Sequence, residues 1–185
     1  DGVSLELPIL ATPAPTNDAG ETTNFEEVDT ELVVEQPDYS DVAATAGEDL
    51  SDMRALFVPA ESINDEGIGT YTALMETYGA NALLLEVKPE SGQLAYASTV
   101  ATAQSYGLSG TYDLQTEVTA LKEQGVYLAA MVSCCVDDLL ATRNSLIALQ
   151  NAYGGVYTDT TGMWLDPYDS TVRNYIDDLV TELAQ

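Results

Sequence analysis

A carboxylate and an ammonium group lie two residues apart in the stretch NALLLEVKPESGQLAY, residues 81–96. Glu86 and Lys88 close an apolar run that has the length and composition of a buried strand. Two interpretations fit such a pair. The side chains form an ion pair that fixes local geometry and adds little stability, or they bind a ligand's polar groups and shift the pKa of a neighbouring carboxyl group. The choice depends on the fold that carries the strand.

The sequence excludes several kinds of reactive site. It contains no histidine, so the commonest general base and the commonest metal ligand are missing, and neither a Ser-His-Asp triad nor a Cys-His pair can form within it. We predict no metal site and no cofactor. The two cysteines, Cys134 and Cys135, are adjacent. This favours two strand cysteines, at least one of them buried, and the alternative is a disulfide between neighbours or a reactive thiol pair.

The charge of the chain is strongly negative. Its 185 residues carry 31 acidic and 5 basic side chains, a formal net charge of −26. Such a surface repels nucleic-acid phosphates and anionic membranes, so we predict no nucleic-acid partner. We also predict no membrane insertion, because no stretch is apolar enough to span a bilayer. A neutral ligand or a cation is compatible with this charge.

The first 53 residues differ in composition from the rest. They hold 14 of the acidic residues and no basic one, and they are rich in Thr and Pro, as in ATPAPTNDAGETTNFEEVDTE. This is typical of a solvated arm, like the stalk that follows a signal or lipoprotein anchor, and it predicts a secreted or cell-surface (bacterial) protein after signal removal. VSLELPIL and ELVVEQP favour edge strands, so we expect part of the arm to pack on the main body or on a neighbouring chain.

The remaining residues, 54–185, alternate between strand and helix patterns. Apolar runs predict strands at 54–60, 81–87 and 126–135, and apolar stripes predict helices at 66–79, 112–125, 137–151 and after Asp169. This alternation predicts parallel pairing through right-handed crossovers. In such folds the chemistry lies at the carboxyl ends of the strands, where the strand pleat would place Glu86 and Lys88 on one face.

Four motifs of this second region resemble a known family. They are RALFVPA at the first strand, NALLLEVKPESGQLAY at the second, EQGVYLAAMV at the third, and GMWLDPYDSTVRNY before the last helix. In type and order they resemble DUF4015-type glycoside-hydrolase-like domains, which are related in fold to the α-amylase TIM barrels. The resemblance covers residues 54–185 and implies an α/β fold, part of a (β/α)8-type barrel with parallel strands, preceded by the acidic arm.

The chain departs from the family pattern in several places. Glu86 stands where the family has the first Asp of its second strand, Met131 where it usually has an Arg, and an aromatic residue is replaced near Cys135. The family's next strand would begin after Gln185, so the carboxylates expected on later strands are missing. Three βα units leave the sheet open. We expect strands of the arm, further copies of the chain, or a longer protein to complete it.

The resemblance implies contact with carbohydrate. Glycoside hydrolysis takes two carboxyl groups, about 5–5.5 Å apart for retention or about 6.5–9.5 Å for inversion. Glu86 with Glu90 or Asp137 is the only pairing that we consider, although Asp137, like Asp138 and Asp169, is also a natural helix cap.

A second group of candidates lies in the loop before the last helix. Trp164, Tyr157 and Tyr168 flank Asp166, and aromatic faces suit sugar C–H surfaces while a carboxylate suits hydroxyl groups. The alternative is a loop that is packed by its own aromatic side chains.

Two functions follow from these observations. The first is a glycoside-hydrolase-like protein that contacts carbohydrate and is not catalytic on its own, with Glu86, Lys88, Trp164, Asp166 and Tyr168 binding the substrate. The second is a non-catalytic structural or interaction module that assembles through its open sheet edge. A cleft joining Glu86, Lys88 and Trp164 would favour the first function, and a strand mouth plugged by apolar residues or by another subunit would favour the second. Either way we expect a homo-oligomer or a swapped arm.

Overall fold

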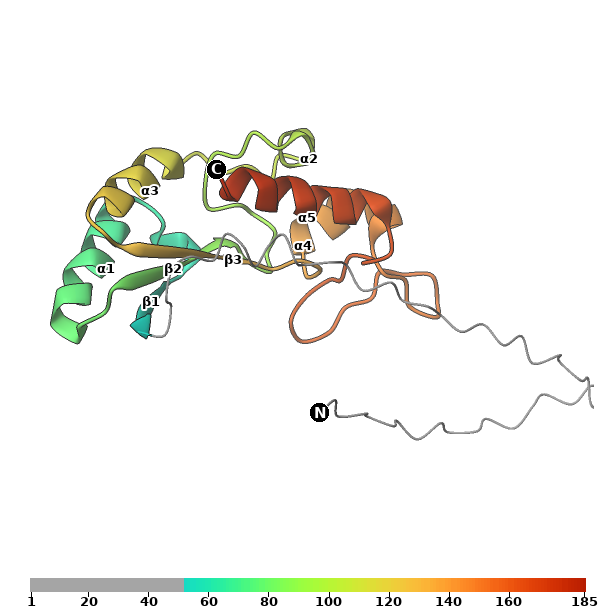
Figure 1. Cartoon of the computed structure of the whole chain (residues 1–185). Coiled ribbons are helices and arrows are strands. Elements are labelled where there is room, and N and C mark those ends of the chain that lie inside the picture. The colour runs from blue at the N-terminus through green and yellow to red at the C-terminus, as the bar shows by residue number, and fades with distance from the viewer. Residues whose placement is uncertain (1–51) are drawn as a thin grey trace, which may run out of the picture. The chain divides into compact units, whose positions relative to one another are not determined.

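The strands of the protein form one sheet in the order β1-β2-β3. The computed structural model describes residues 52–185, and its strands are β1 (Ala55–Val58), β2 (Ala82–Lys88) and β3 (Tyr127–Val132). Both strand pairs are parallel, and all three strands run in the same direction in Figure 1. The predicted α/β fold with parallel strands is therefore confirmed, as an open three-stranded sheet within the described residues. Residues 1–51 of the predicted arm lie outside the described residues. The two candidate edge strands of the arm fall within that part.

Helices connect and flank these strands. Residues 52–185 contain α1 (Asp65–Tyr78), α2 (Ala101–Ser105), α3 (Leu114–Glu123), α4 (Asp138–Arg143) and α5 (Ser170–Leu183), with 3-10 turns η2 (Ala60–Ser62) and η3 (Ser145–Ile147). The expected cap at Asp169 is present, because its side chain accepts the backbone N–H of Thr171 at 2.7 Å. Asp113 caps α3 in the same way and accepts the backbone N–H of Thr116 at 3.2 Å. Gly79 ends α1 with a φ of 63°, a left-handed conformation that favours glycine. None of these helices is long and apolar enough to cross a bilayer.

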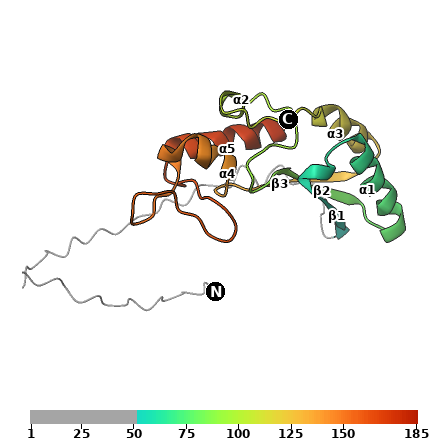
Figure 2. The ribbon, with the colours of Figure 1, turned by 180° about the vertical axis from the view of Figure 1, so that it is seen from behind.

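The two faces of the sheet differ in how well they are covered. Leu83, Leu85 and Val87 of β2 are buried on the face that packs against α1 and α3, which lie together at one end of the ribbon in both views (Figures 1 and 2). On the opposite face Phe57 is 46% exposed, and Met131 is also exposed. Within residues 52–185 one layer of helices thus covers one face, and the other face is left open.

The segment after β3 corrects one expectation. We predicted a helix over 137–151, but α4 ends at Arg143. Asn144 leaves the helical conformation with a φ of −143°, and its side chain accepts the N–H of Leu146 in η3. The chain then makes antiparallel bridges, Ala148 with Leu165 and Gln150 with Val156. Backbone pairing with the later loop has replaced the helical hydrogen bonds that the apolar pattern predicted.

Candidate functional site

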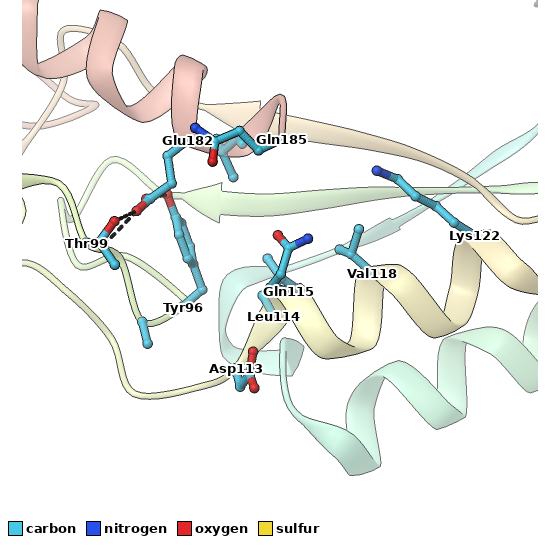
Figure 3. A pocket seen from close by; sticks show the side chains of 11 residues that line it. Tyr96, Thr99, Asp113, Leu114, Gln115, Val118, Lys122, Glu182 and Gln185 are labelled. Atoms are coloured by element: carbon cyan, nitrogen blue, oxygen red, sulfur yellow. Dashed lines mark hydrogen bonds between the residues drawn. The ribbon is translucent and has the colours of Figure 1, made fainter.

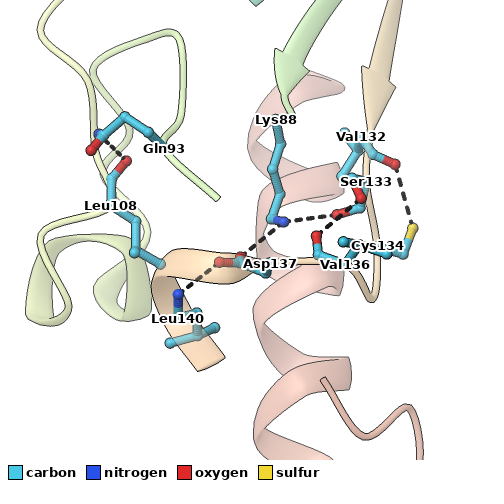
Figure 4. A network of polar contacts seen from close by, with 9 residues as sticks. All are labelled: Lys88, Gln93, Leu108, Val132, Ser133, Cys134, Val136, Asp137 and Leu140. Carbon is cyan, nitrogen blue, oxygen red and sulfur yellow. Dashed lines mark hydrogen bonds and ion pairs between the residues drawn. The ribbon is translucent and has the colours of Figure 1, made fainter. Parts of the chain in front are cut away.

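A buried ion pair closes the carboxyl ends of β2 and β3 (Figure 4). Lys88 Nζ lies 2.9 Å from Asp137 Oδ2, and neither side chain has any exposed surface. The ammonium group also donates to the backbone carbonyl of Ser133 at 2.8 Å. The other carboxylate oxygen of Asp137 accepts the N–H of Leu140 at 2.7 Å, so Asp137 caps α4 as predicted. The pair links both strand ends to a helix start, and Lys88 cannot touch a ligand in this conformation.

The loop after β2 seals this pair from solvent. Gly92 has a φ of 86° and lies so close to Asp137 that a Cβ atom there would overlap the carboxylate. The backbone N–H groups of Asp138 and Leu139 donate to the carbonyls of Glu90 and Ser91. Glu90 therefore belongs to the cover over Asp137 through its backbone, and the cover depends on a glycine at position 92.

The regular pleat that would place Glu86 and Lys88 on one face is interrupted between them. The pairing of β2 with β3 is interrupted between them, so that Glu86 pairs with Met131 but Lys88 pairs with Val132. An extra residue of this kind breaks the alternation of side chains along a strand. Glu86 stays partly exposed, and its Oε2 accepts the N–H of Ala60 at 3.0 Å. The expected Glu86–Lys88 ion pair does not form, because Asp137 takes the ammonium group.

The aromatic residues of the later loop lie on a hairpin that we name the aromatic hairpin, residues 156–168. Thr158 and Met163 form its antiparallel bridge, and the N–H of Trp164 donates to the carbonyl of Tyr157 at 3.1 Å. Side chains next to a bridged pair share the opposite face of a hairpin. Trp164 and Tyr157 are therefore neighbours, and both are at least partly exposed.

Hydrogen bonds fix the indole ring of Trp164. Its Nε1–H donates to Asp159 Oδ2 at 2.9 Å. The other oxygen of Asp159 accepts the N–H and the hydroxyl group of Thr161. The hydrogen bonds from Thr161 lower the pKa of Asp159 below its usual value more than any other cause. The bond from the indole N–H of Trp164 lowers this pKa further. Asp159 stays ionised at neutral pH, so the ring is held by a charged acceptor.

The other predicted residues of this loop shape its end. Asp166 accepts the N–H of Tyr168 at 2.9 Å, which makes a turn before α5. Tyr168 is 86% exposed, and its carbonyl accepts from Arg173. The structure thus keeps Trp164, Asp166 and Tyr168 on one hairpin. Among the described residues no hydrogen bond or ion pair joins them to Glu86 or Lys88.

Comparisons with known proteins assign the family. A family model for DUF4015, described as a putative glycosyl hydrolase domain, matches residues 55–185. The chain belongs to the DUF4015 family. Its fold is similar to the crystal structure of a hypothetical protein from Ruminiclostridium thermocellum ATCC 27405, with 19% sequence identity, a TM-score of 0.59, and coverage of 69% of this chain and 70% of that chain. A search of curated proteins found no match.

The DUF4015 domain also contains a carboxylate that our reading of the sequence missed (Figure 3). Glu182 of α5 accepts from Tyr96 at 2.8 Å and Ser98 at 2.6 Å, and its other oxygen accepts the N–H and the hydroxyl group of Thr99, both at 2.6 Å. Burial raises its pKa, but these bonds outweigh burial and leave the pKa below its usual value. The sequence pattern that could have identified Glu182 is its position on the buried stripe of the helix, three residues after Leu179 and seven after Tyr175.

Glu182 also borders the cavity drawn in Figure 3. Its volume is about 310 Å³, and Leu114, Lys122 and Gln185 are among its other lining residues. Because both oxygens of Glu182 are occupied by protein donors, this carboxylate ties α5 to the loop before α2 rather than offering a free base. Within residues 52–185 of the DUF4015 domain, no group of three or more acidic or sulfur side chains is placed to hold a metal ion.

Proposed function

We propose that this DUF4015 domain contacts carbohydrate through its aromatic hairpin and does not cleave glycosides on its own. One observation carries the proposal. The ring of Trp164 is held by the charged Asp159 beside the exposed Tyr157, on a chain whose family is described as a glycosyl hydrolase domain. A fixed aromatic surface suits a sugar ring because it loses little entropy on binding.

The charge of the chain supports a neutral ligand. A formal net charge of −26 disfavours anionic partners, whereas neutral sugars bring no charge. Tyr168 and Asp166 extend the hairpin with a second exposed aromatic ring and a carboxylate. Glu86 would join such a site only from the open sheet face. A secreted or cell-surface location stays a prediction.

The strand ends support the absence of catalysis. Glycoside hydrolysis takes two available carboxyl groups. Asp137 is buried, ion-paired and caps a helix, and Glu86 accepts a backbone N–H. Both members of the Glu86–Asp137 pair therefore have structural partners.

Affinity electrophoresis tests the proposed contact. Gels containing soluble β-glucan, xylan, mannan or starch should retard the wild-type chain in at least one case. Trp164→Ala should weaken that retardation about tenfold or more, because a central aromatic contact carries much of the binding energy. Tyr153→Ala is the matched control, since Tyr153 is 98% exposed in the same loop but precedes the hairpin. Retardation in no gel, or equal losses for both variants, would refute the contact.

The open sheet supports a second candidate, a module that assembles through its sheet. β1 and β3 each have one neighbour within the described residues, and Phe57 and Met131 expose apolar surface on the uncovered face. An unpaired strand beside such a face is a usual place for another chain to bind.

Sedimentation equilibrium tests this second candidate. The wild-type chain should associate with rising concentration, and Phe57→Asp should reduce the association. Leu146→Asp is the control, because Leu146 is equally apolar and more exposed but lies away from the sheet in η3. A wild-type chain that is monomeric at every concentration would exclude assembly through this sheet.

A further inference from the structure

Two adjacent thiols line a small apolar cavity directly after β3. Cys134 and Cys135 are both free; the first is exposed and the second is partly exposed. Their cavity has a volume of about 190 Å³ and is also lined by Pro167, Val172, Arg173, Ile176 and Asp177. The loop before α5 and the first half of that helix thus face both thiols.

The two thiols differ in their surroundings. Cys134 is exposed, and its Sγ lies 3.7 Å from the carbonyl oxygen of Val132 (Figure 4). Burial raises the pKa of Cys135, and the neighbouring Cys134 raises it further, while Lys88 acts in the opposite direction. An accessible thiol next to a less accessible one is the arrangement of an attacking and a resolving cysteine.

We propose that Cys134 and Cys135 form a dithiol site that exchanges with small, uncharged disulfides and closes into a disulfide between neighbours. The thiolate of Cys134 attacks one sulfur of the small disulfide, forms a mixed disulfide and releases one thiolate. The thiolate of Cys135 then attacks the Cys134 sulfur, forms the Cys134–Cys135 bond and releases the second thiolate. The two protons of the cysteine thiols end on the two released thiols, so the small disulfide is reduced as the pair is oxidised.

The ring that forms is easily reopened. Adjacent Cα atoms are about 3.8 Å apart, which is shorter than the usual separation of about 4.4–6.8 Å across a disulfide. Such a bond is strained, and strained disulfides are the labile ones. The exchange is therefore reversible by ordinary thiols.

The backbone around the thiols is fixed on both sides. Before them, Ser133 makes two hydrogen bonds with Lys88. Lys88 Nζ donates to the carbonyl of Ser133 at 2.8 Å, and the N–H of Ser133 donates to the carbonyl of Lys88 at 2.8 Å. After them the carbonyl of Cys135 accepts the N–H of Leu165 at 2.7 Å, and Val136 bridges to Trp164. Because the segment is held at both ends, closing the ring shifts the aromatic hairpin. Only the consequence for carbohydrate contact depends on the proposed function.

Intact mass and tryptophan fluorescence test the site without any sugar. The reduced chain is treated with hydroxyethyl disulfide, with Cys135→Ser and Cys134→Ser as matched variants. We expect the wild type to lose two hydrogen atoms and keep no added group, and Cys135→Ser to stop at the mixed disulfide. Cys134→Ser should react at least about tenfold more slowly than Cys135→Ser, because its remaining thiol is less accessible. Trp164 is the only tryptophan, so its emission should change in the wild type and return with dithiothreitol.

Each alternative result overturns the proposal. A stable mixed disulfide on the wild type, equal rates for the two single variants, or disulfide-linked dimers would exclude ring closure. An emission spectrum that stays unchanged while the mass shows the ring would exclude the link to the aromatic hairpin. Failure of sugar binding with normal exchange would refute only the proposed function.

Discussion

Two carboxylates tie the helices of this domain to its strands and loops, and they are stabilised in different ways. Asp137 faces a cation, Lys88, at 2.9 Å with no exposed surface on either side chain. Glu182 has no ion-pair partner within residues 52–185 and is held by four bonds from neutral donors of Tyr96, Ser98 and Thr99. A buried ion pair leaves an uncompensated charge when one partner is removed. A carboxylate held by several neutral donors loses its support one bond at a time.

Despite this difference, neither carboxylate is available for a reaction. Both have all their strongest donors within the protein, and both connect a helix to a strand end or a loop. The aromatic hairpin differs from them, since its charged Asp159 holds a ring that is still partly exposed. The structural carboxylates and the proposed contact surface are therefore separate parts of the domain.

Removing the cation tests the first carboxylate most strongly. Lys88→Met should lower the free energy of unfolding by about 3–5 kcal/mol, because Asp137 keeps a buried charge without a partner. Urea unfolding measures the loss. Lys122→Met is the control, since Lys122 is exposed on α3. A loss no larger than that of the control would show that the ion pair does not hold the strand ends.

Crowding the same carboxylate gives the next effect. Gly92→Ala should cost about 1–3 kcal/mol more than Gly125→Ala, because the added methyl group must displace Asp137. Both glycines have a positive φ, 86° and 78°, but Gly125 has open space around its Cβ position. The difference in urea midpoint therefore isolates the close approach. Equal costs would mean that the cover over Asp137 moves freely.

The second carboxylate should respond more mildly. Glu182→Gln should lower the free energy of unfolding by about 1–2 kcal/mol, because one amide nitrogen cannot accept the bonds that an oxygen accepted. Tyr96, Ser98 and Thr99 keep partial partners, so the loss stays below that of Lys88→Met.

The pH dependence of the same variant sharpens this result. The folded-state pKa of Glu182 lies below its usual value of 4.5, so its contribution is present above that pH and is lost as the pH falls through the lowered pKa. The stability difference between the wild type and Glu182→Gln should therefore shrink below about pH 4.5. A difference that is the same at pH 7 and at pH 3 would contradict the assignment of this lowered pKa to Glu182.

The smallest effect on stability is expected from a change at Tyr175, a residue that both carboxylates influence. Tyr175 is fully buried and its hydroxyl group has no partner among the described residues. Its pKa is raised, chiefly by burial and then by the charges of Asp137 and, further down, Glu182. Tyr175→Phe should change stability by less than about 1 kcal/mol, or increase it, because an unpaired polar group is removed. A larger loss in thermal unfolding would reveal a partner, such as a bridging water.

The repeating elements were predictable from the sequence because local patterns encode them. Apolar runs located the three strands, and Asp169 marked a helix start by its capping chemistry. The third strand was predicted too long, because β3 ends at Val132, so Cys134 and Cys135 lie beyond the strand and neither is buried. The parallel pairing then followed from the alternation of strands and helices.

The site was less predictable, because single non-local contacts decide it. The irregularity between Glu86 and Lys88 lies in the pairing with β3 and interrupts the expected alternation of side chains. The partner of Lys88 is 49 positions away in the numbering, at Asp137, and no local pattern specifies such a contact. Helix α4 ends early for the same reason, since the residues after it pair with a later loop through antiparallel bridges. The clustering of Trp164, Asp166 and Tyr168 was visible because it is local.

Two-dimensional NMR titration with short oligosaccharides of glucose, xylose and mannose tests the central claim most directly. The chain has one tryptophan, so one indole N–H signal reports on the ring of Trp164. We predict that a binding oligosaccharide shifts this signal and the amides of the aromatic hairpin, while the amides of Glu86 and Lys88 stay in place. Shifts confined to the strand ends, with a still indole signal, would contradict the account.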